Sequence, residues 1–159
     1  MNFPILSSLI LLPTVGSIFI LFGKSSSNYN SAKYISLFIS IGNFILSLYL
    51  WYLFDKNISD FQFVEERIWL DGFINYKVGI DGISILFIIL TTFITSICVI
   101  SVNSSIKHRL KDFLAAILFM ETMMIGVFCS LDLVIFYLFF EAGLIPMFLI
   151  IGIWGGSRR

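Results

Sequence analysis

The chain has 159 residues, of which 58% are hydrophobic and only 13% are charged. Soluble domains carry about 25% charged residues, so the composition excludes an ordinary soluble domain and indicates an integral membrane protein. The ten basic and ten acidic residues give a formal net charge of zero, which says nothing about partners, and we expect no nucleic-acid partner.

Five apolar stretches are bordered by polar residues, and each is long enough for a transmembrane helix. A helix needs about 20 residues to cross the hydrocarbon core of a bilayer. The stretches are 3–23, 34–54, 82–105, 113–131 and 133–154. We therefore expect an all-α integral membrane protein with about five transmembrane helices, forming a single membrane domain over residues 1–159.

The first stretch, 3–23, follows a terminus without basic residues, because Met1-Asn2-Phe3 contains no Lys or Arg. This terminus resembles neither a secretory signal nor an Arg-rich transit peptide, so we expect a retained transmembrane helix. Pro13 lies inside the stretch and removes one backbone hydrogen bond, a defect that bends a helix and that neighbouring helices can repair.

The basic residues predict how the chain is oriented. Short loops on the cytoplasmic side of a membrane are rich in Lys and Arg. One side of the chain receives Lys24, Lys33, Lys107, Arg109, Lys111, Arg158 and Arg159. The other side receives only Lys56, Arg67 and Lys77, which lie among Asp55, Asp60, Glu65, Glu66 and Asp71. We expect the N-terminus outside and the C-terminus inside, which requires an odd number of spans.

Residues 55–80 form the one sizeable extramembrane segment that we expect. Five aromatic residues in it suit the membrane interface: Phe61, Phe63, Trp69, Phe73 and Tyr76. Asp71-Gly72 lies between two strand-like runs, which indicates a β-hairpin. A loop lying on the membrane surface is the alternative.

Several polar residues near the later spans suit structural roles. Asp81 and Asp132 come directly before the third and fifth spans and are candidate helix N-caps. His108 lies in a basic loop, where we expect it to contact headgroups rather than donate protons. Four residues of the third span are expected to satisfy helix contacts rather than line a water path: Thr91, Thr92, Thr95 and Ser96.

Nothing in the sequence predicts a metal or cofactor site. Cys98 and Cys129 lie in apolar stretches without Cys/His spacing, so we expect both to be small packing residues. The chain also lacks a Gly-rich phosphate-binding motif, a cysteine set for an iron–sulfur cluster and paired histidines for haem. We expect no metal, no cofactor and no redox centre in this chain.

Two acidic residues lie inside the expected spans and are our candidate catalytic residues. Glu121 is the only charge in 113–131, and Glu141 is the only charge in 133–154, with Pro146 shortly after it. Each is about ten residues from the turn between these spans, so at a rise of about 1.5 Å per residue both lie near the middle of the bilayer. A carboxylate there costs about 2.5 kcal/mol or more.

The charge state of such an acid can be switched by a nearby cation or by water, which indicates proton handling. The alternative for each acid is a protonated glutamate that holds neighbouring helices together by hydrogen bonding. All ten Lys and Arg lie in loops or at the ends of spans. A cationic partner must therefore come from another chain or from sequence beyond Arg159, and without it we expect the acid to be neutral.

Three motifs give the sequence a resemblance to a known family. They are Val78-Gly79-Ile80-Asp81-Gly82-Ile83-Ser84, Ile125-Gly126-Val127-Phe128-Cys129, and Phe140-Glu141-Ala142-Gly143-Leu144-Ile145-Pro146-Met147 followed by Trp154-Gly155-Gly156. Together they resemble subunit 4 of respiratory complex I, the antiporter-like, proton-pumping chain 4 of NADH–ubiquinone oxidoreductase. The likeness extends over nearly the whole chain and is weakest before Phe61.

The resemblance implies that Glu141 is the family's essential glutamate of the fifth helix, which works with a lysine on a later broken helix. Glu121 matches a position that is acidic in some members only. The implied function is proton translocation coupled to electron transfer from NADH to ubiquinone, with NADH, FMN, iron–sulfur clusters and ubiquinone bound elsewhere in the complex. The implied partners are the lipid bilayer and other complex I membrane subunits, including the lysine-bearing helix.

The resemblance also implies that the chain is a truncated, split or partial subunit, because family members have many more helices. Two other functions stay open: a subunit of a multi-subunit cation/proton antiporter, and a structural or assembly subunit without proton conduction. The abundance of Ile, Phe, Asn, Lys, Tyr and Ser is typical of an AT-rich genome. We expect a multi-pass protein of the mitochondrial inner membrane, with the bacterial cytoplasmic membrane as the alternative.

Overall fold

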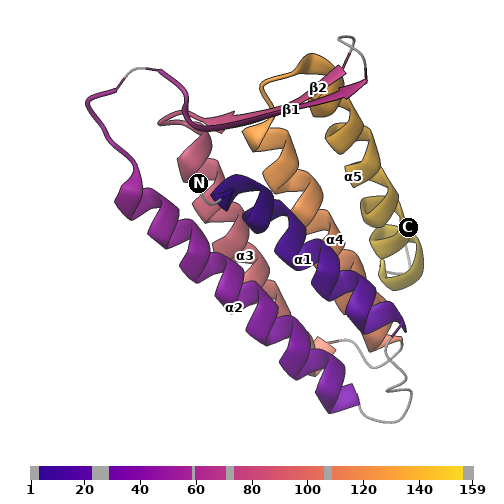
Figure 1. Ribbon diagram of the computed structural model, residues 1–159. Coiled ribbons are helices and arrows are strands. Elements are labelled where there is room, and N and C mark those ends of the chain that lie inside the picture. Colours follow the sequence, from indigo (N-terminus) through magenta and orange to yellow (C-terminus); the bar gives the residue numbers. More distant parts are fainter. Residues whose placement is uncertain (1–3, 23–28, 59, 71–73, 106–108, 156–159) are drawn as a thin grey trace.

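The computed structural model describes residues 4–22, 29–58, 60–70, 74–105 and 109–155. It contains α1 (Ile5–Phe22), α2 (Tyr29–Leu53), β1 (Gln62–Leu70), β2 (Ile74–Ile80), α3 (Ser84–Ser105), α4 (Leu110–Cys129) and α5 (Leu133–Trp154), as shown in Figure 1. Among the described residues, five helices are long and apolar enough to cross a membrane. The expected all-α membrane protein with five spans is confirmed.

The segment between α2 and α3 forms an antiparallel β-hairpin rather than an irregular surface loop. It covers one end of the helices (Figure 1). The predicted Asp71-Gly72 turn lies outside the described residues. Between the pairs Gln62↔Ile80 and Glu65↔Val78 the strand register shifts, and Phe63 takes a left-handed backbone conformation with φ 53°. Such bulges redirect side chains near a sheet edge.

Two helices begin earlier than the charge pattern predicted. α2 begins at Tyr29 instead of residue 34, and α4 begins at Leu110 instead of residue 113. The predicted boundaries fell at charged residues, but a Lys near a helix end can pack its stem along the helix and keep its ammonium in water. In the first turn of α4, Asp112 accepts a hydrogen bond from Arg109 at 2.9 Å.

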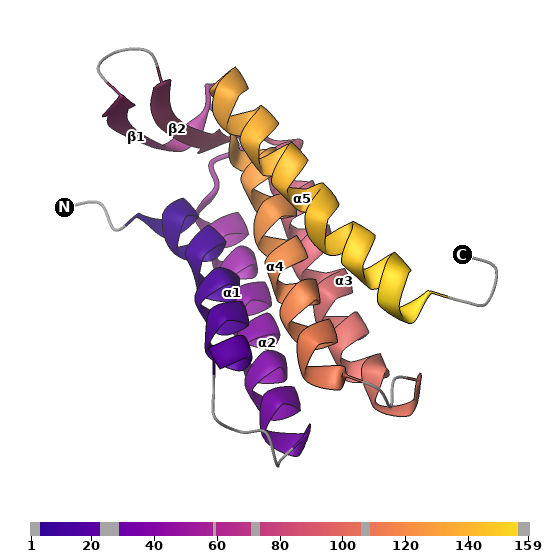
Figure 2. The ribbon, with the colours of Figure 1, turned by 90° about the vertical axis from the view of Figure 1, so that its right-hand side faces the viewer.

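The four helices α1 to α4 form one bundle, and α5 lies against its side. α4 packs against each of the other four helices, whereas α5 packs mainly against α4. Figure 2 shows α5 on the outer side of α4. Only Ile135 and Pro146 of α5 are buried. Most of the α5 surface is therefore exposed.

A close approach between backbone and ring fixes α5 on α4. A Cβ added to Gly126 of α4 would lie 2.5 Å from Cδ1 of Phe139 on α5. One turn further along α5, a Cβ on Gly143 would lie 3.4 Å from Cβ of Met123. Small residues let membrane helices pack closely where no hydrophobic effect drives association. Gly126 and Phe139 therefore set which face of α5 contacts the bundle.

Both predicted helix caps are confirmed. Asp132 Oδ1 accepts hydrogen bonds from the amides of Val134 (2.8 Å) and Ile135 (3.2 Å) at the start of α5. Asp81 Oδ1 accepts one from the Ser84 amide at 2.7 Å. Hydrogen bonds from Ser84 hold the pKa of Asp81 below its usual value. Both acids satisfy amides that a helix N-terminus leaves without partners.

The hairpin also caps α1, although it lies far away in sequence. Glu65 of β1 accepts hydrogen bonds from the amides of Leu6 (Oε1, 2.9 Å) and Ser7 (Oε2, 3.1 Å), and from the Ser7 hydroxyl. An anion at a helix N-terminus is stabilised by free amides and by the helix dipole. Glu65 therefore attaches the hairpin to the first transmembrane helix.

We predict that Glu65→Ala lowers the free energy of unfolding by about 1–2 kcal/mol, because α1 loses its cap. Glu66→Ala is the matched control, since Glu66 only pairs with Lys77 at 3.4 Å on an exposed surface. Such a pair is worth less than about 1 kcal/mol. Thermal unfolding of the purified variants in detergent, followed by circular dichroism, measures both. Equal losses in the two variants would show that Glu65 does not cap α1.

We predict that Gly126→Ala destabilises the contact between α4 and α5 by about 1–3 kcal/mol, because the new methyl group overlaps the Phe139 ring. Phe139→Leu in the same chain should recover part of that loss. Gly152→Ala is the control, since a Cβ at Gly152 meets nothing within 4 Å. The test is a double-mutant cycle of unfolding free energies, and simple additivity of the two substitutions would contradict the close approach.

Candidate functional site

A polar layer divides the buried interior of the bundle into two apolar clusters. The cluster at the hairpin end contains Ile10, Leu50, Ile88 and Ile125, and the cluster at the other end contains Ile20, Ala32, Val99 and Leu118. Between these positions each of the four helices places polar side chains: Thr14 and Ser17 on α1, Ser36, Ser40, Asn43 and Ser47 on α2, Thr92, Thr95 and Ser96 on α3, and Glu121 and Thr122 on α4. We call these eleven residues the polar layer.

Glu121 is the one ionisable member of the polar layer. Its side chain is 1% exposed, and its Oε1 accepts a hydrogen bond from Nδ2 of Asn43 at 2.8 Å. Asn43 is fully buried on α2. Two buried oxygens of this pair have no hydrogen-bond partner among the described residues, namely Oε2 of Glu121 and Oδ1 of Asn43. A native structure rarely leaves such atoms unsatisfied.

The hydroxyl groups of the layer connect neighbouring helices. Ser47 of α2 and Thr92 of α3 lie 2.9 Å apart through their hydroxyl oxygens, and the Ser96 hydroxyl donates to the Ser40 carbonyl at 3.2 Å. The predicted role of Thr92 and Ser96 in helix contacts is confirmed. A further hydrogen bond of the polar layer joins α1 to α4: the Thr14 hydroxyl donates to the Thr122 hydroxyl at 3.0 Å.

Glu141 lies in a different environment from Glu121. It is exposed on α5, and the Tyr137 hydroxyl lies one turn earlier on the same helix, where it interacts electrostatically with the Glu141 carboxylate. The buried residues Ile135 and Pro146 are three turns apart and share one face. At about 100° per residue, Glu141 lies about 120–140° around the helix from that face. Its side chain therefore points away from the bundle.

The structure does not bring the two acids together. Glu121 projects into the contact between α4 and α2, and Glu141 projects from the outer side of α5. Equal distance from the shared turn fixes the depth of a residue but not the rotation of its helix. Here the packing of Gly126 on Phe139 sets that rotation. The two acids are therefore separate candidate sites.

Other predicted residues have mixed outcomes. Cys129 is buried in the core as expected, whereas Cys98 is exposed on α3 and does not pack in the interior. The prediction for Cys98 was wrong because an apolar span does not reveal which of its faces is buried. His108 lies outside the described residues.

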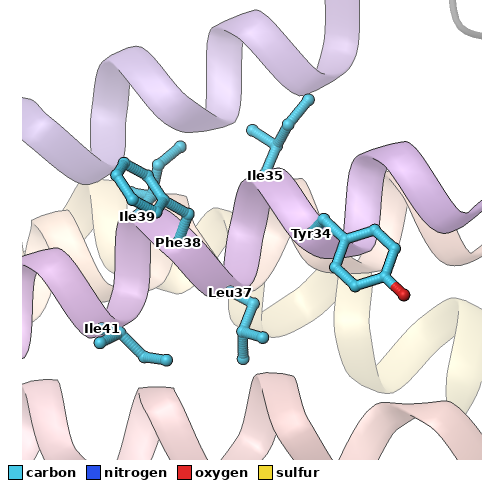
Figure 3. A pocket seen from close by; sticks show the side chains of 6 residues that line it. All are labelled: Tyr34, Ile35, Leu37, Phe38, Ile39 and Ile41. Carbon is cyan, nitrogen blue, oxygen red and sulfur yellow. The ribbon is translucent and has the colours of Figure 1, made fainter.

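One depression in the surface lacks the chemistry of a small-molecule site. It follows the first half of α2, has a volume of about 630 Å³ and is shown in Figure 3. Its lining residues are Tyr34, Ile35, Leu37, Phe38, Ile39 and Ile41. The Tyr34 hydroxyl is the only polar side-chain group among them. Ligand sites combine apolar walls with several convergent polar groups, so this surface does not qualify.

The residue that sequence reasoning missed is Asn43. The available signal was the repeat of Ser36, Ser40, Asn43 and Ser47 inside an apolar span, at spacings of four, three and four residues. Residues at such spacings share one helix face. An apolar span with one polar face contacts other helices through that face. The pattern therefore indicated the buried face of α2, but the contact between Asn43 and Glu121 came only from the structure.

The fold and its buried polar residues define the class of protein. Five candidate spans and buried polar residues between the helices are features of a multi-pass membrane protein. A comparison with protein-family models gave no match. A comparison with curated proteins found relatives that are similar over most of this chain.

The chain is 47% identical to NADH-ubiquinone oxidoreductase chain 4 of Marchantia polymorpha and 48% identical to that of Arabidopsis thaliana, in each case over 97% of this chain and 31% of the relative. It is 50% identical to NADH-quinone oxidoreductase subunit M of Rhodobacter capsulatus over 86% of this chain and 26% of the relative. The chain is thus a homologue of the N-terminal part of chain 4, or subunit M, of NADH–quinone oxidoreductase. It spans about a third of the length of these relatives.

Proposed function

We propose that this chain acts as part of a membrane subunit of a proton-translocating NADH:quinone oxidoreductase, in which Glu141 takes up and releases a proton during turnover. The names of the relatives support the oxidoreductase complex. The position of one acid supports the proton step. Glu141 is the single charged residue of α5 and lies near the middle of its 22 residues.

The exposure of Glu141 is the observation that carries this proposal. A charged side chain inside a bilayer faces a protein partner or a water-filled cavity rather than lipid. The four other described helices leave Glu141 uncovered, because it points away from them. We infer that a further element covers this side of α5 and brings the groups that control the proton.

The charge state of Glu141 would follow the distance of a cation. A nearby ammonium keeps the carboxylate ionised, and its withdrawal lets the acid take a proton from water. Each tenfold change in proton affinity corresponds to about 1.4 kcal/mol. The basic residues that the structure describes lie near helix ends or in the segment between α2 and α3, far from the middle of α5: Lys33, Lys56, Arg67, Lys77, Arg109 and Lys111. The cation therefore belongs to the covering element, which we propose to be a lysine-bearing helix.

The redox chemistry would take place elsewhere in the complex. In this proposal NADH, FMN, the iron–sulfur clusters and ubiquinone bind to other subunits, and this chain contacts neighbouring membrane subunits and lipid. We place the complex in the mitochondrial inner membrane, which the residue composition supports, with the bacterial cytoplasmic membrane as the alternative. A proton-translocating role needs no redox group in this chain.

We predict that Glu141→Gln in the assembled complex abolishes most NADH-driven proton pumping, because the amide cannot release a proton. Proton uptake by sealed membrane vesicles, followed with a pH-sensitive dye, is the measurement. Glu66→Gln is the matched control, since it removes an acid in the hairpin and should leave pumping unchanged. The amount of assembled complex is determined for each variant.

Near-normal pumping by Glu141→Gln would reject the proposed role and favour a purely structural chain. The assembly measurement shows whether pumping is lost only because the complex fails to assemble. In that case Tyr137→Phe gives a milder test. That variant removes the hydroxyl one turn before Glu141 on the same helix, so it should change the pH dependence of pumping. An unchanged profile would contradict proton exchange at Glu141.

Purification of the chain without redox subunits would favour a cation/proton antiporter.

A further inference from the structure

Glu121 and Asn43 present a pair of unsatisfied oxygens in the buried interior of the bundle. Both side chains are at least 99% buried, and one hydrogen bond of 2.8 Å joins them. Oε2 of Glu121 and Oδ1 of Asn43 remain without a partner in the described structure. In an ionised glutamate both of these atoms are acceptors, so neither can satisfy the other.

A single proton on Glu121 would give both unsatisfied oxygens a hydrogen-bond partner. A neutral carboxylic acid presents one donor and one acceptor side by side, and so does the primary amide of Asn. The two groups can then form a ring of two hydrogen bonds. In one bond Nδ2 of Asn43 donates to Oε1 of Glu121, as observed. In the other, the protonated Oε2 of Glu121 donates to Oδ1 of Asn43.

The surroundings favour the neutral form, because no other charge faces Glu121 within the described residues. α1 has no titratable residue at all. The side chains of Tyr34, Tyr49 and Tyr52 on α2, Cys98 on α3, and Tyr137 and Glu141 on α5 are exposed and point away from the interior. Lys33, Lys111, Asp112 and Cys129 lie two or more turns along their helices from the Glu121–Asn43 contact. Burial of an unpaired carboxylate would be costly.

We propose that Glu121 and Asn43 form a second proton-binding site, in which one exchangeable proton is shared between Oε2 of Glu121 and Oδ1 of Asn43 in the contact between α4 and α2. This site is distinct from Glu141 and does not depend on the function proposed for Glu141. The hydroxyls of Ser40 and Ser47 lie about one turn on either side of Asn43 on the same buried face. They are the polar side chains next to Asn43 along that face of α2.

The isosteric amide of Gln separates the hydrogen bonds of this pair from its exchangeable proton. The amide of Gln at position 121 also places a donor beside an acceptor, so Glu121→Gln keeps both hydrogen bonds of the ring and loses only the exchangeable acid proton. We therefore expect Glu121→Gln to assemble normally. Replacement of Asn43 by Leu removes the partner and leaves the acid proton in place.

The test is infrared absorption of the purified intact complex at pH 7, in H₂O and in D₂O. Subtraction of the Glu121→Gln spectrum from the unsubstituted spectrum should show the C=O stretch of a protonated carboxylic acid, and this band should move in D₂O. Asn43→Leu should shift the band to higher frequency, because the C=O loses its N–H donor. If Asn43→Leu does not assemble, Asn43→Ala serves the same purpose, since it also removes the amide donor.

Two control variants establish that the band belongs to the Glu121–Asn43 pair. Thr122→Val removes a buried hydroxyl of the same layer, which bonds to Thr14, and should leave the band in place. Glu141→Gln should also keep the band, even where pumping is lost, so the two proposals fail independently. The proposal is wrong if the difference spectrum shows an ionised carboxylate, or if the band does not respond to D₂O or to substitution of Asn43.

Discussion

A carboxyl group placed inside an apolar layer must gain a partner or lose its charge, and this constraint organises the molecule. The chain meets it in two ways. Glu121 is enclosed by α2 and α4 and bonds to Asn43. Glu141 stands on the outer side of α5, one turn from Tyr137 of its own helix and away from the other described helices. Glu121 has a hydrogen-bond partner within the described structure, whereas we propose that the groups that control Glu141 come from a covering element outside it.

The hairpin and the helix contacts hold these acids in place. Glu65 links the hairpin to the N-terminus of α1, and α1 bonds to α4 next to Glu121 through Thr14 and Thr122. α5 rests on α4 through Gly126 and Phe139. Polar atoms at interfaces between membrane helices favour particular pairings, so the polar layer helps to specify the bundle as well as to house an acid.

The sequence predicted the features that depend on one-dimensional pattern. Apolar length gave the five spans, and the position of an aspartate before a span gave the caps at Asp81 and Asp132. The sequence pattern did not predict how each helix is rotated about its axis, because a span that is hydrophobic on all sides does not reveal which face is buried. For that reason Cys98 was misplaced, and the separation of Glu121 from Glu141 was not foreseen. The partner of Glu121 was missed although the polar repeat around Asn43 was present.

The central claim is that the proton on Glu141 changes during turnover, and infrared difference spectroscopy of the intact complex tests it most directly. Spectra recorded before and during NADH oxidation are compared for the unsubstituted complex and for a complex without the carboxyl group at position 141. The account predicts a carboxyl band that appears or disappears with turnover and is missing when that group is absent. A Glu141 carboxyl band of constant intensity throughout turnover would contradict it.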